Sequence, residues 1–124
     1  TTHGPVKGVR IKTNVDLFRD ASRSKDVNVF RGIPYAAPPV GQRRFEKPVP
    51  PRRWETALDA TEFGTSCIWA INLFNDSQSE DCLFLNVFAP VQESEEFPNG
   101  YPVMVWIHGG AFVFGTSTKF AARE

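Results

Sequence analysis

The sequence predicts an α/β chain that is rich in strands and poor in helices. Four segments have the residue pattern of strands, and the last of them, residues 102–107, is a near-continuous apolar run. Such a run is typical of a strand that is covered on both faces, as in parallel sheets. Helical patterns are short: residues 56–63 are predicted to hold one or two turns, and residues 118–124 are predicted to begin a helix.

The three earlier strand candidates follow from alternation and composition. Residues 6–12 alternate loosely around Val9 and Ile11, and residues 27–35 are rich in β-forming side chains. Residues 83–89 place large apolar side chains on one face and then on the other. Successive side chains of a strand point to opposite faces, so each of these segments is predicted to be a strand.

Prolines dominate the connection between the second and third strand candidates. Residues 34–51 contain six of the ten prolines, which lack an N–H donor and fix φ, so this segment is predicted to run extended over a surface. A proline-rich linker or a ligand for a peptide-binding module has the same composition. Because Tyr35, Phe45 and Trp54 offer large apolar anchors, we expect a strap packed onto the core. Later, residues 91–100 form an acidic loop whose Pro-Asn-Gly end predicts a turn.

Charge and composition exclude several classes of function. The 14 basic and 14 acidic residues cancel, so no basic field attracts nucleic acid or an anionic membrane surface. No apolar run is long enough to span a bilayer. Cys67 and Cys82 flank an N-glycosylation pattern at Asn75, and the combination favours a secreted or ER-lumenal chain. The chain begins with Thr1, which leaves a removed leader open.

The stretch WIHGGAFVFG, residues 106–115, loses its side chains at Gly109, Gly110 and Ala111. Small residues let a charged atom approach the backbone closely, and preorganised N–H donors of this kind form an oxyanion hole worth about 3 kcal/mol per donor. A tight turn, or close packing beneath another strand, is the competing explanation. On the glycines alone, that structural explanation is favoured.

Three motifs in the same order resemble the type-B carboxylesterase family, which includes cholinesterases and bile-salt-stimulated lipase. They are FRGIPYAAPPVGQRRF at residues 30–45, SEDCLFLNVFAP at residues 79–90 and WIHGGAF at residues 106–112. The resemblance implies the N-terminal portion of an α/β-hydrolase fold, with a small N-terminal sheet and the first strands of a mixed central sheet. Residues 1–124 would then be an N-terminal fragment of a single domain, with no internal boundary.

The resemblance also implies roles for the glycine stretch. The backbone N–H groups of Gly110 and Ala111 would be the oxyanion donors, and Gly109 would serve the turn. His108 precedes any possible nucleophile, whereas the family order places the base last, so it is expected to hold the loop by a hydrogen bond. The serine elbow G-x-S-x-G is missing: residues 64–68 and 115–119 have the first Gly and the Ser but not the second Gly. The nucleophile, acid and base are therefore not expected in this sequence.

Further residues match structural positions of the family. Cys67 and Cys82 match its first disulfide, and Arg44 and Glu80 match a pair that forms a buried salt bridge. That bridge would tie the strap to the loop that Cys67 and Cys82 close, called the cysteine loop below. Trp69 does not align with the choline-binding tryptophan of cholinesterases, and we expect it to pack at the base of the cysteine loop.

The function implied is a serine hydrolase that cleaves carboxylic esters through an acyl-enzyme, without metal or organic cofactor. Its partner would be a small-molecule or lipid ester; the oligomeric state is left open. The alternative is a non-catalytic, neuroligin-like adhesion ectodomain, because fold does not fix function. In the implied topology a later strand lies between residues 83–89 and 102–107, so the fragment alone is expected to be unstable. Because it lacks the triad, it is also expected to be inactive.

Overall fold

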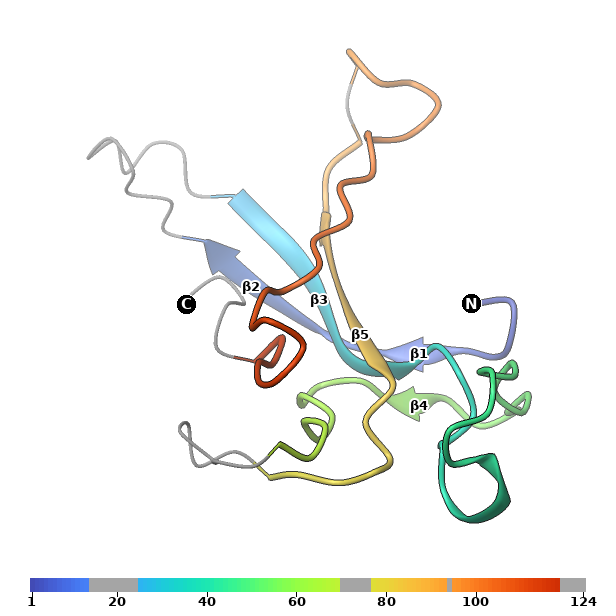
Figure 1. Ribbon diagram of the computed structural model, residues 1–124. Coiled ribbons are helices and arrows are strands. Elements are labelled where there is room, and N and C mark those ends of the chain that lie inside the picture. The colour runs from blue at the N-terminus through green and yellow to red at the C-terminus, as the bar shows by residue number, and fades with distance from the viewer. Residues whose placement is uncertain (14–24, 70–76, 94, 119–124) are drawn as a thin grey trace.

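The structure is a computed structural model that describes residues 1–13, 25–69, 77–93 and 95–118. Figure 1 shows a long twisted sheet, with a shorter strand pair beside one end of it. The elements in chain order are β1 (Val6–Lys7), β2 (Val9–Thr13), β3 (Lys25–Pro34), the 3-10 helix η2 (Gly41–Arg43), β4 (Leu58–Asp59) and β5 (Phe84–Pro90).

The main sheet is antiparallel and has the order β2-β3-β5. Its strands confirm the predictions at residues 6–12, 27–35 and 83–89, with the first of these divided into β1 and β2 at Gly8. Glycine is needed at this position, because a Cβ on Gly8 would lie 2.2 Å from the carbonyl oxygen of Val29. Val29 is fully buried at the centre of this contact.

A bulge in β3 directs the Arg31 N–H away from β5. The register with β5 shifts between Phe30 and Ile33, where Gly32 has a φ of 66°. The Arg31 N–H donates to the carbonyl of Ala60 at 2.7 Å, which ties the main sheet to the segment after β4. The left-handed conformation of Gly32 costs little because the residue has no Cβ.

The predicted helical turns at residues 56–63 are wrong. The segment instead contains β4, which pairs in parallel with β1. The Leu58 N–H donates to the carbonyl of Pro5 at 3.0 Å, and the Ala60 N–H donates to that of Lys7 at 2.8 Å. Tertiary pairing takes up donors that a helix would direct four residues back.

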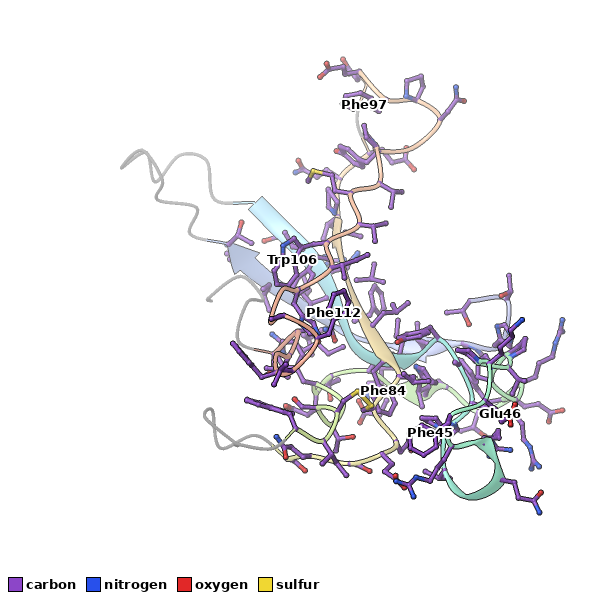
Figure 2. All side chains as sticks on the ribbon, in the orientation of Figure 1. Phe45, Glu46, Phe84, Phe97, Trp106 and Phe112 are labelled. Carbon is purple, nitrogen blue, oxygen red and sulfur yellow. A yellow bond between two sulfur atoms is a disulfide. The ribbon has the colours of Figure 1, made fainter. Side chains whose placement is uncertain are left out.

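The proline-rich strap is attached near its two ends. Ala36 is buried, and the Trp54 indole N–H donates to the carbonyl of Pro5 at 2.7 Å, so Trp54 anchors as expected. Tyr35 and Phe45 are 51% and 98% exposed, which makes the prediction that they anchor the strap wrong. Between these residues the strap closes on itself and not on the sheet, and Figure 2 shows Phe45 far from Trp106 and Phe112.

The predicted strand at residues 102–107 is wrong for this structure. The segment does not form a strand, and its apolar side chains are 82–95% exposed at Val103, Met104, Val105 and Ile107. A strand is held by ladder hydrogen bonds to a neighbour, and none of the described strands pairs with this segment. The preceding turn is confirmed: the Gly100 N–H donates to the carbonyl of Phe97 at 3.0 Å. Figure 1 shows this loop projecting beyond the end of β5.

Candidate functional site

The glycine stretch forms a tight turn centred on Gly110. Gly110 has a φ of 132°, and Ala111 and Phe112 follow in the left-handed region at 54° and 58°. The Gly110 carbonyl accepts the N–H groups of Val113 at 2.9 Å and Phe114 at 3.1 Å. A Cβ on Gly110 would lie 1.6 Å from the carbonyl oxygen of Phe114, so glycine is required here on two counts.

The turn exposes the two backbone donors that the sequence singles out. In the part of the chain that the structure describes, the N–H groups of Gly110 and Ala111 donate no hydrogen bond to another protein group. Ala111 is exposed and Gly110 half-buried. Gly109, expected to serve the turn, lies just before it: its φ is not left-handed, and a Cβ there would meet open space. The reversal itself falls on residues 110–112.

His108 and Gly115 close the two ends of the turn against each other. The Nδ1 atom of His108 lies 2.8 Å from the Gly109 carbonyl oxygen, a contact in which the ring nitrogen must be the donor. A Cβ on Gly115 would lie 2.5 Å from that same carbonyl oxygen and 2.6 Å from His108 Nδ1. Residues 108–115 therefore form one closed unit, with His108 at its edge and exposed to solvent.

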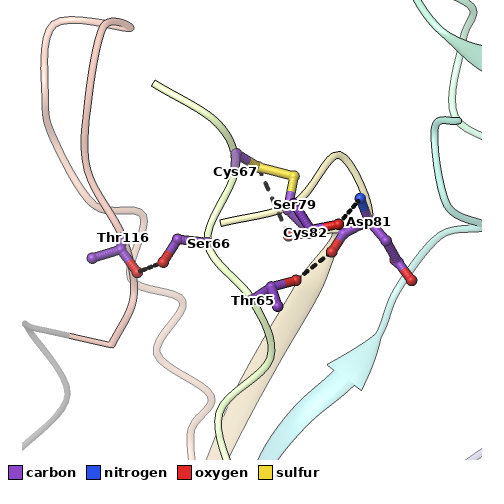
Figure 3. Close-up of a disulfide and its surroundings, with 7 residues drawn as sticks. All are labelled: Thr65, Ser66, Cys67, Ser79, Asp81, Cys82 and Thr116. Carbon is purple, nitrogen blue, oxygen red and sulfur yellow. Dashed lines mark hydrogen bonds between the residues drawn. A yellow bond between two sulfur atoms is a disulfide. The ribbon is translucent and has the colours of Figure 1, made fainter. Parts of the chain in front are cut away.

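Two attachments fix the end of this unit to the rest of the chain. The Thr116 hydroxyl lies 2.7 Å from the Ser66 hydroxyl, and both residues are buried (Figure 3). The Thr118 N–H donates to Thr116 Oγ1 at 3.2 Å. At the next residue, the Asn86 side-chain amide donates to the Ser117 hydroxyl at 3.1 Å.

Asn86 connects the site to the β3 bulge and is a residue that sequence reasoning missed. Its Oδ1 accepts the Gly32 N–H at 3.0 Å while its Nδ2 reaches Ser117, so one amide joins β3, β5 and the segment after the turn. Asn is depleted in strands, and its place between Leu85 and Val87 in β5 is the signal that could have found it.

The cysteine loop supplies the other side of the site. Cys67 and Cys82 form the disulfide, with a Cα–Cα separation of 4.9 Å (Figure 3). Beside it, the Ser66 N–H donates to the Ser77 carbonyl at 2.9 Å, and the Ser66 carbonyl accepts the Ser79 N–H at 2.9 Å. Asn75, the predicted glycosylation site, lies outside the described residues.

Trp69 packs where it was expected, at the base of the cysteine loop. It is 9% exposed, and its ring centroid lies 6.1 Å from that of Phe114 in the turn. This contact adds an apolar attachment to the polar ones at Thr116 and Ser117.

Arg44 and Glu80 form the expected ion pair, but not a buried one. Arg44 Nε lies 2.6 Å from Glu80 Oε1, which links the strap to the cysteine loop. The two side chains are 53% and 38% exposed, because the strap lies at the surface here. An exposed pair contributes only about 0–1 kcal/mol, so the expectation of a buried bridge is corrected for this structure.

The two serines of the incomplete elbow motifs are not arranged as nucleophiles. Ser66 Oγ contacts Thr116 and Ser117 Oγ contacts Asn86; no hydrogen bond from a histidine to either is found among the described residues. Those residues also contain no cluster of three or more metal-ligating side chains and no helix of sufficient length and apolarity for a bilayer. The groups of this site that remain available for chemistry are the backbone N–H donors of the turn.

Comparison with known proteins matches this arrangement to one family. The family model described as the carboxylesterase family matches residues 1–124. The para-nitrobenzyl esterase of Bacillus subtilis is 44% identical over 125 residues, covering 96% of this chain and 22% of that protein. The mouse cholinesterase is 42% identical over 115 residues, covering 78% of this chain and 18% of that protein.

Solved structures give the same result. A thermophilic PNB esterase superposes with a TM-score of 0.73 at 43% identity, covering 95% of this chain and 22% of that chain. The carboxylesterase EST55 of Geobacillus stearothermophilus superposes with a TM-score of 0.62 at 43% identity, covering 74% and 18%. The fold is thus that of the N-terminal region of an α/β-hydrolase. The chain spans about a fifth of the length of the relatives it matches.

Proposed function

Because the chain belongs to the carboxylesterase family, we propose that it supplies the oxyanion hole of a serine hydrolase acting on carboxylic esters. The observation that carries the proposal is the exposed turn at residues 110–112, in which the N–H groups of Gly110 and Ala111 bind no other group of the described part of the chain. Donors held in one orientation stabilise a charge that develops only in the transition state.

The proposed reaction divides the active site between this chain and residues outside it. A serine oxygen attacks the ester carbonyl carbon while a histidine takes the serine proton. The carbonyl oxygen becomes an oxyanion and receives the two N–H donors of the turn. The intermediate then expels the alcohol, which takes the proton from histidine, and leaves an acyl-serine. Water cleaves the acyl-serine by the same steps and releases the carboxylic acid.

Residues 1–124 would then be the N-terminal part of one hydrolase domain and inactive alone. A small-molecule or lipid ester is the proposed substrate class. The similarity to a para-nitrobenzyl esterase and to a medium-chain fatty acyl-CoA hydrolase supports this breadth. The Cys67–Cys82 disulfide supports a secreted or ER-lumenal location, since disulfides persist in oxidising compartments.

The proposal is tested by expressing the complete coding sequence in which these residues occur. We expect hydrolysis of p-nitrophenyl butyrate, a burst of p-nitrophenol equal to the enzyme concentration, and none of this from residues 1–124 expressed alone. A complete protein that folds but neither hydrolyses a panel of p-nitrophenyl esters nor reacts with a serine-directed fluorophosphonate would contradict the proposal. That outcome would favour the adhesion alternative.

A further inference from the structure

We propose that Thr116 and Ser66 are positioning residues for the two oxyanion donors, an inference that rests on the function proposed above. Thr116 follows the turn directly, and Ser66 lies next to the disulfide in the cysteine loop. Their hydroxyl oxygens are 2.7 Å apart, and the residues are only 4% and 6% exposed. These are the buried polar residues of the part of the chain that the structure describes.

The turn is held together by its own contacts, so its position relative to the sheet depends on its attachments. The Gly110 carbonyl binds two later N–H groups, and Gly115 packs against the Gly109 carbonyl. These contacts hold the shape of residues 108–115 but do not place that shape relative to the sheet. A displacement at Thr116 is therefore transmitted to the N–H groups of Gly110 and Ala111.

Ser66 is a firm point of attachment. Its backbone N–H and carbonyl are both engaged, by Ser77 and Ser79 at 2.9 Å each, and the next residue is cross-linked to Cys82. The Thr116 hydroxyl thus docks on one of the most constrained backbone segments described. The Thr116 hydroxyl also contacts the hydroxyl and the N–H of Thr118, at 3.0 and 3.2 Å. Removal of the Thr116 hydroxyl would leave the buried Ser66 hydroxyl without this partner, which is costly in a site shielded from water.

The second attachment, from Asn86 to Ser117, holds the adjacent residue to the sheet. Asn86 is half-buried, whereas the Ser66–Thr116 pair is shielded from water. The buried pair is therefore expected to be the contact whose loss displaces the turn most, since water reaches the part-buried contact more easily than the buried one.

The test uses the complete protein with Thr116→Val, which keeps the side-chain shape and removes the hydroxyl. We expect kcat for p-nitrophenyl butyrate to fall by about 10- to 100-fold, below the ~10²–10³ loss for removing an oxyanion donor outright. KM should change by less than about twofold, because the donors act on the transition state. Affinity for a trifluoromethyl ketone, whose adduct carries an oxyanion, should fall by the same factor as kcat. Thr116→Ser should restore both.

Thr65→Val is the matched control. The Thr65 hydroxyl also donates in this region, to the carbonyl of Asp81, and among the described residues it makes no hydrogen bond to the turn (Figure 3). Both valine variants should lower the melting temperature, and only Thr116→Val should lower kcat and ketone affinity. Ser66→Ala should reproduce the effect from the other side, and the double variant should lose no more than the worse single variant.

The inference is overturned by equal kcat losses in Thr65→Val and Thr116→Val, or by a Thr116→Val variant that loses only thermal stability. Additive losses in the double variant would also overturn it. Failure of the proposed function is distinguishable, because it would leave the unsubstituted complete protein without esterase activity.

Discussion

Gly110 combines a backbone conformation and a close contact that a side chain would disrupt. Its φ of 132° is accessible to glycine, and a Cβ there would overlap the Phe114 carbonyl oxygen at 1.6 Å. Gly41 offers a comparison: its φ of 58° is also left-handed, but a Cβ would meet open space. The two positions separate conformational strain from steric overlap.

We expect Gly110→Ala in the complete protein to lower kcat by at least about 100-fold, because the overlap displaces a donor whose loss costs 10²–10³. Gly41→Ala carries only left-handed strain of about 1–2 kcal/mol and should keep its kcat. Initial rates with p-nitrophenyl butyrate test the pair. Wild-type kcat in Gly110→Ala would mean that the turn does not carry the oxyanion donors.

A second prediction for single residues concerns pH. The Thr61 hydroxyl, at 2.7 Å from Asp59 Oδ1, and then the Thr61 N–H, at 3.1 Å, hold the pKa of Asp59 below its ordinary value of 3.8. A depressed pKa stabilises the fold above that ordinary value, and the contribution is lost as pH falls through the folded-state pKa.

Thr61→Val should therefore raise the pKa of Asp59 toward 3.8, while Thr61→Ser should leave it depressed. Carboxyl-carbon NMR titration of the complete protein measures this shift. The stability difference between the two variants should be present at neutral pH and shrink below pH 3.8. A difference that grows as the pH falls would reverse the assigned cause.

At the scale of elements, the Cys67–Cys82 disulfide restricts the conformation of the cysteine loop. The disulfide closes a loop with a sequence separation of 15, which the chain-entropy relation values at about 3 kcal/mol. Replacing both cysteines by serine should lower the free energy of unfolding of the complete protein by about that amount. Urea denaturation measures it, and non-reducing peptide mapping checks the bond. Two alkylatable thiols in the unsubstituted secreted protein would contradict the pairing.

Strands could be predicted where both the pattern and the pairing partner lie within the described chain. β2, β3 and β5 meet that condition, and their alternation sufficed. Residues 102–107 have an equally strong pattern but no partner strand here, and residues 56–63 follow a neighbour and not their own propensity. The local sequence shows whether a segment can form a strand, whereas a pairing partner decides whether it does so.

In the candidate site too, residues with a local signal in the sequence could be predicted, and residues defined by long-range contacts could not. Gly110 and Ala111 could be singled out because the glycine stretch is local in the sequence, and their proposed role came from the family resemblance. Asn86 could not be, since its partners Gly32 and Ser117 lie 54 and 31 residues away. The Ser66–Thr116 pair spans 50 residues and likewise leaves no local signature. Contacts of this range become visible only when the elements are placed.

For the whole molecule, the balance between buried and exposed apolar surface indicates how stable residues 1–124 would be on their own. The buried apolar residues described are few and mostly small, while an apolar segment and the aromatic ring of Phe112 face solvent (Figure 2). Hydrophobic burial is the main favourable term in folding, and here much of it is unrealised. The described core is Val29, Ile33, Ala36, Ala60 and Trp69.

We therefore expect residues 1–124 expressed alone to lack a cooperative thermal transition and to bind the dye ANS strongly. The complete protein, with the same segment covered, should melt cooperatively and bind little dye. Differential scanning calorimetry and amide NMR spectra distinguish the two. A sharp transition with dispersed amide resonances from the 124 residues alone would show that their own core is sufficient.

The exposed segment at residues 103–107 has a consequence for biosynthesis. Chains leave the ribosome N-terminus first, at about 5–20 residues per second. In a protein of the relatives' length, this apolar stretch would emerge early and remain uncovered while most of the polypeptide was still being translated. Transiently exposed apolar surface makes incomplete chains prone to aggregation, so this stretch would be a liability until the segment that covers it had been synthesised.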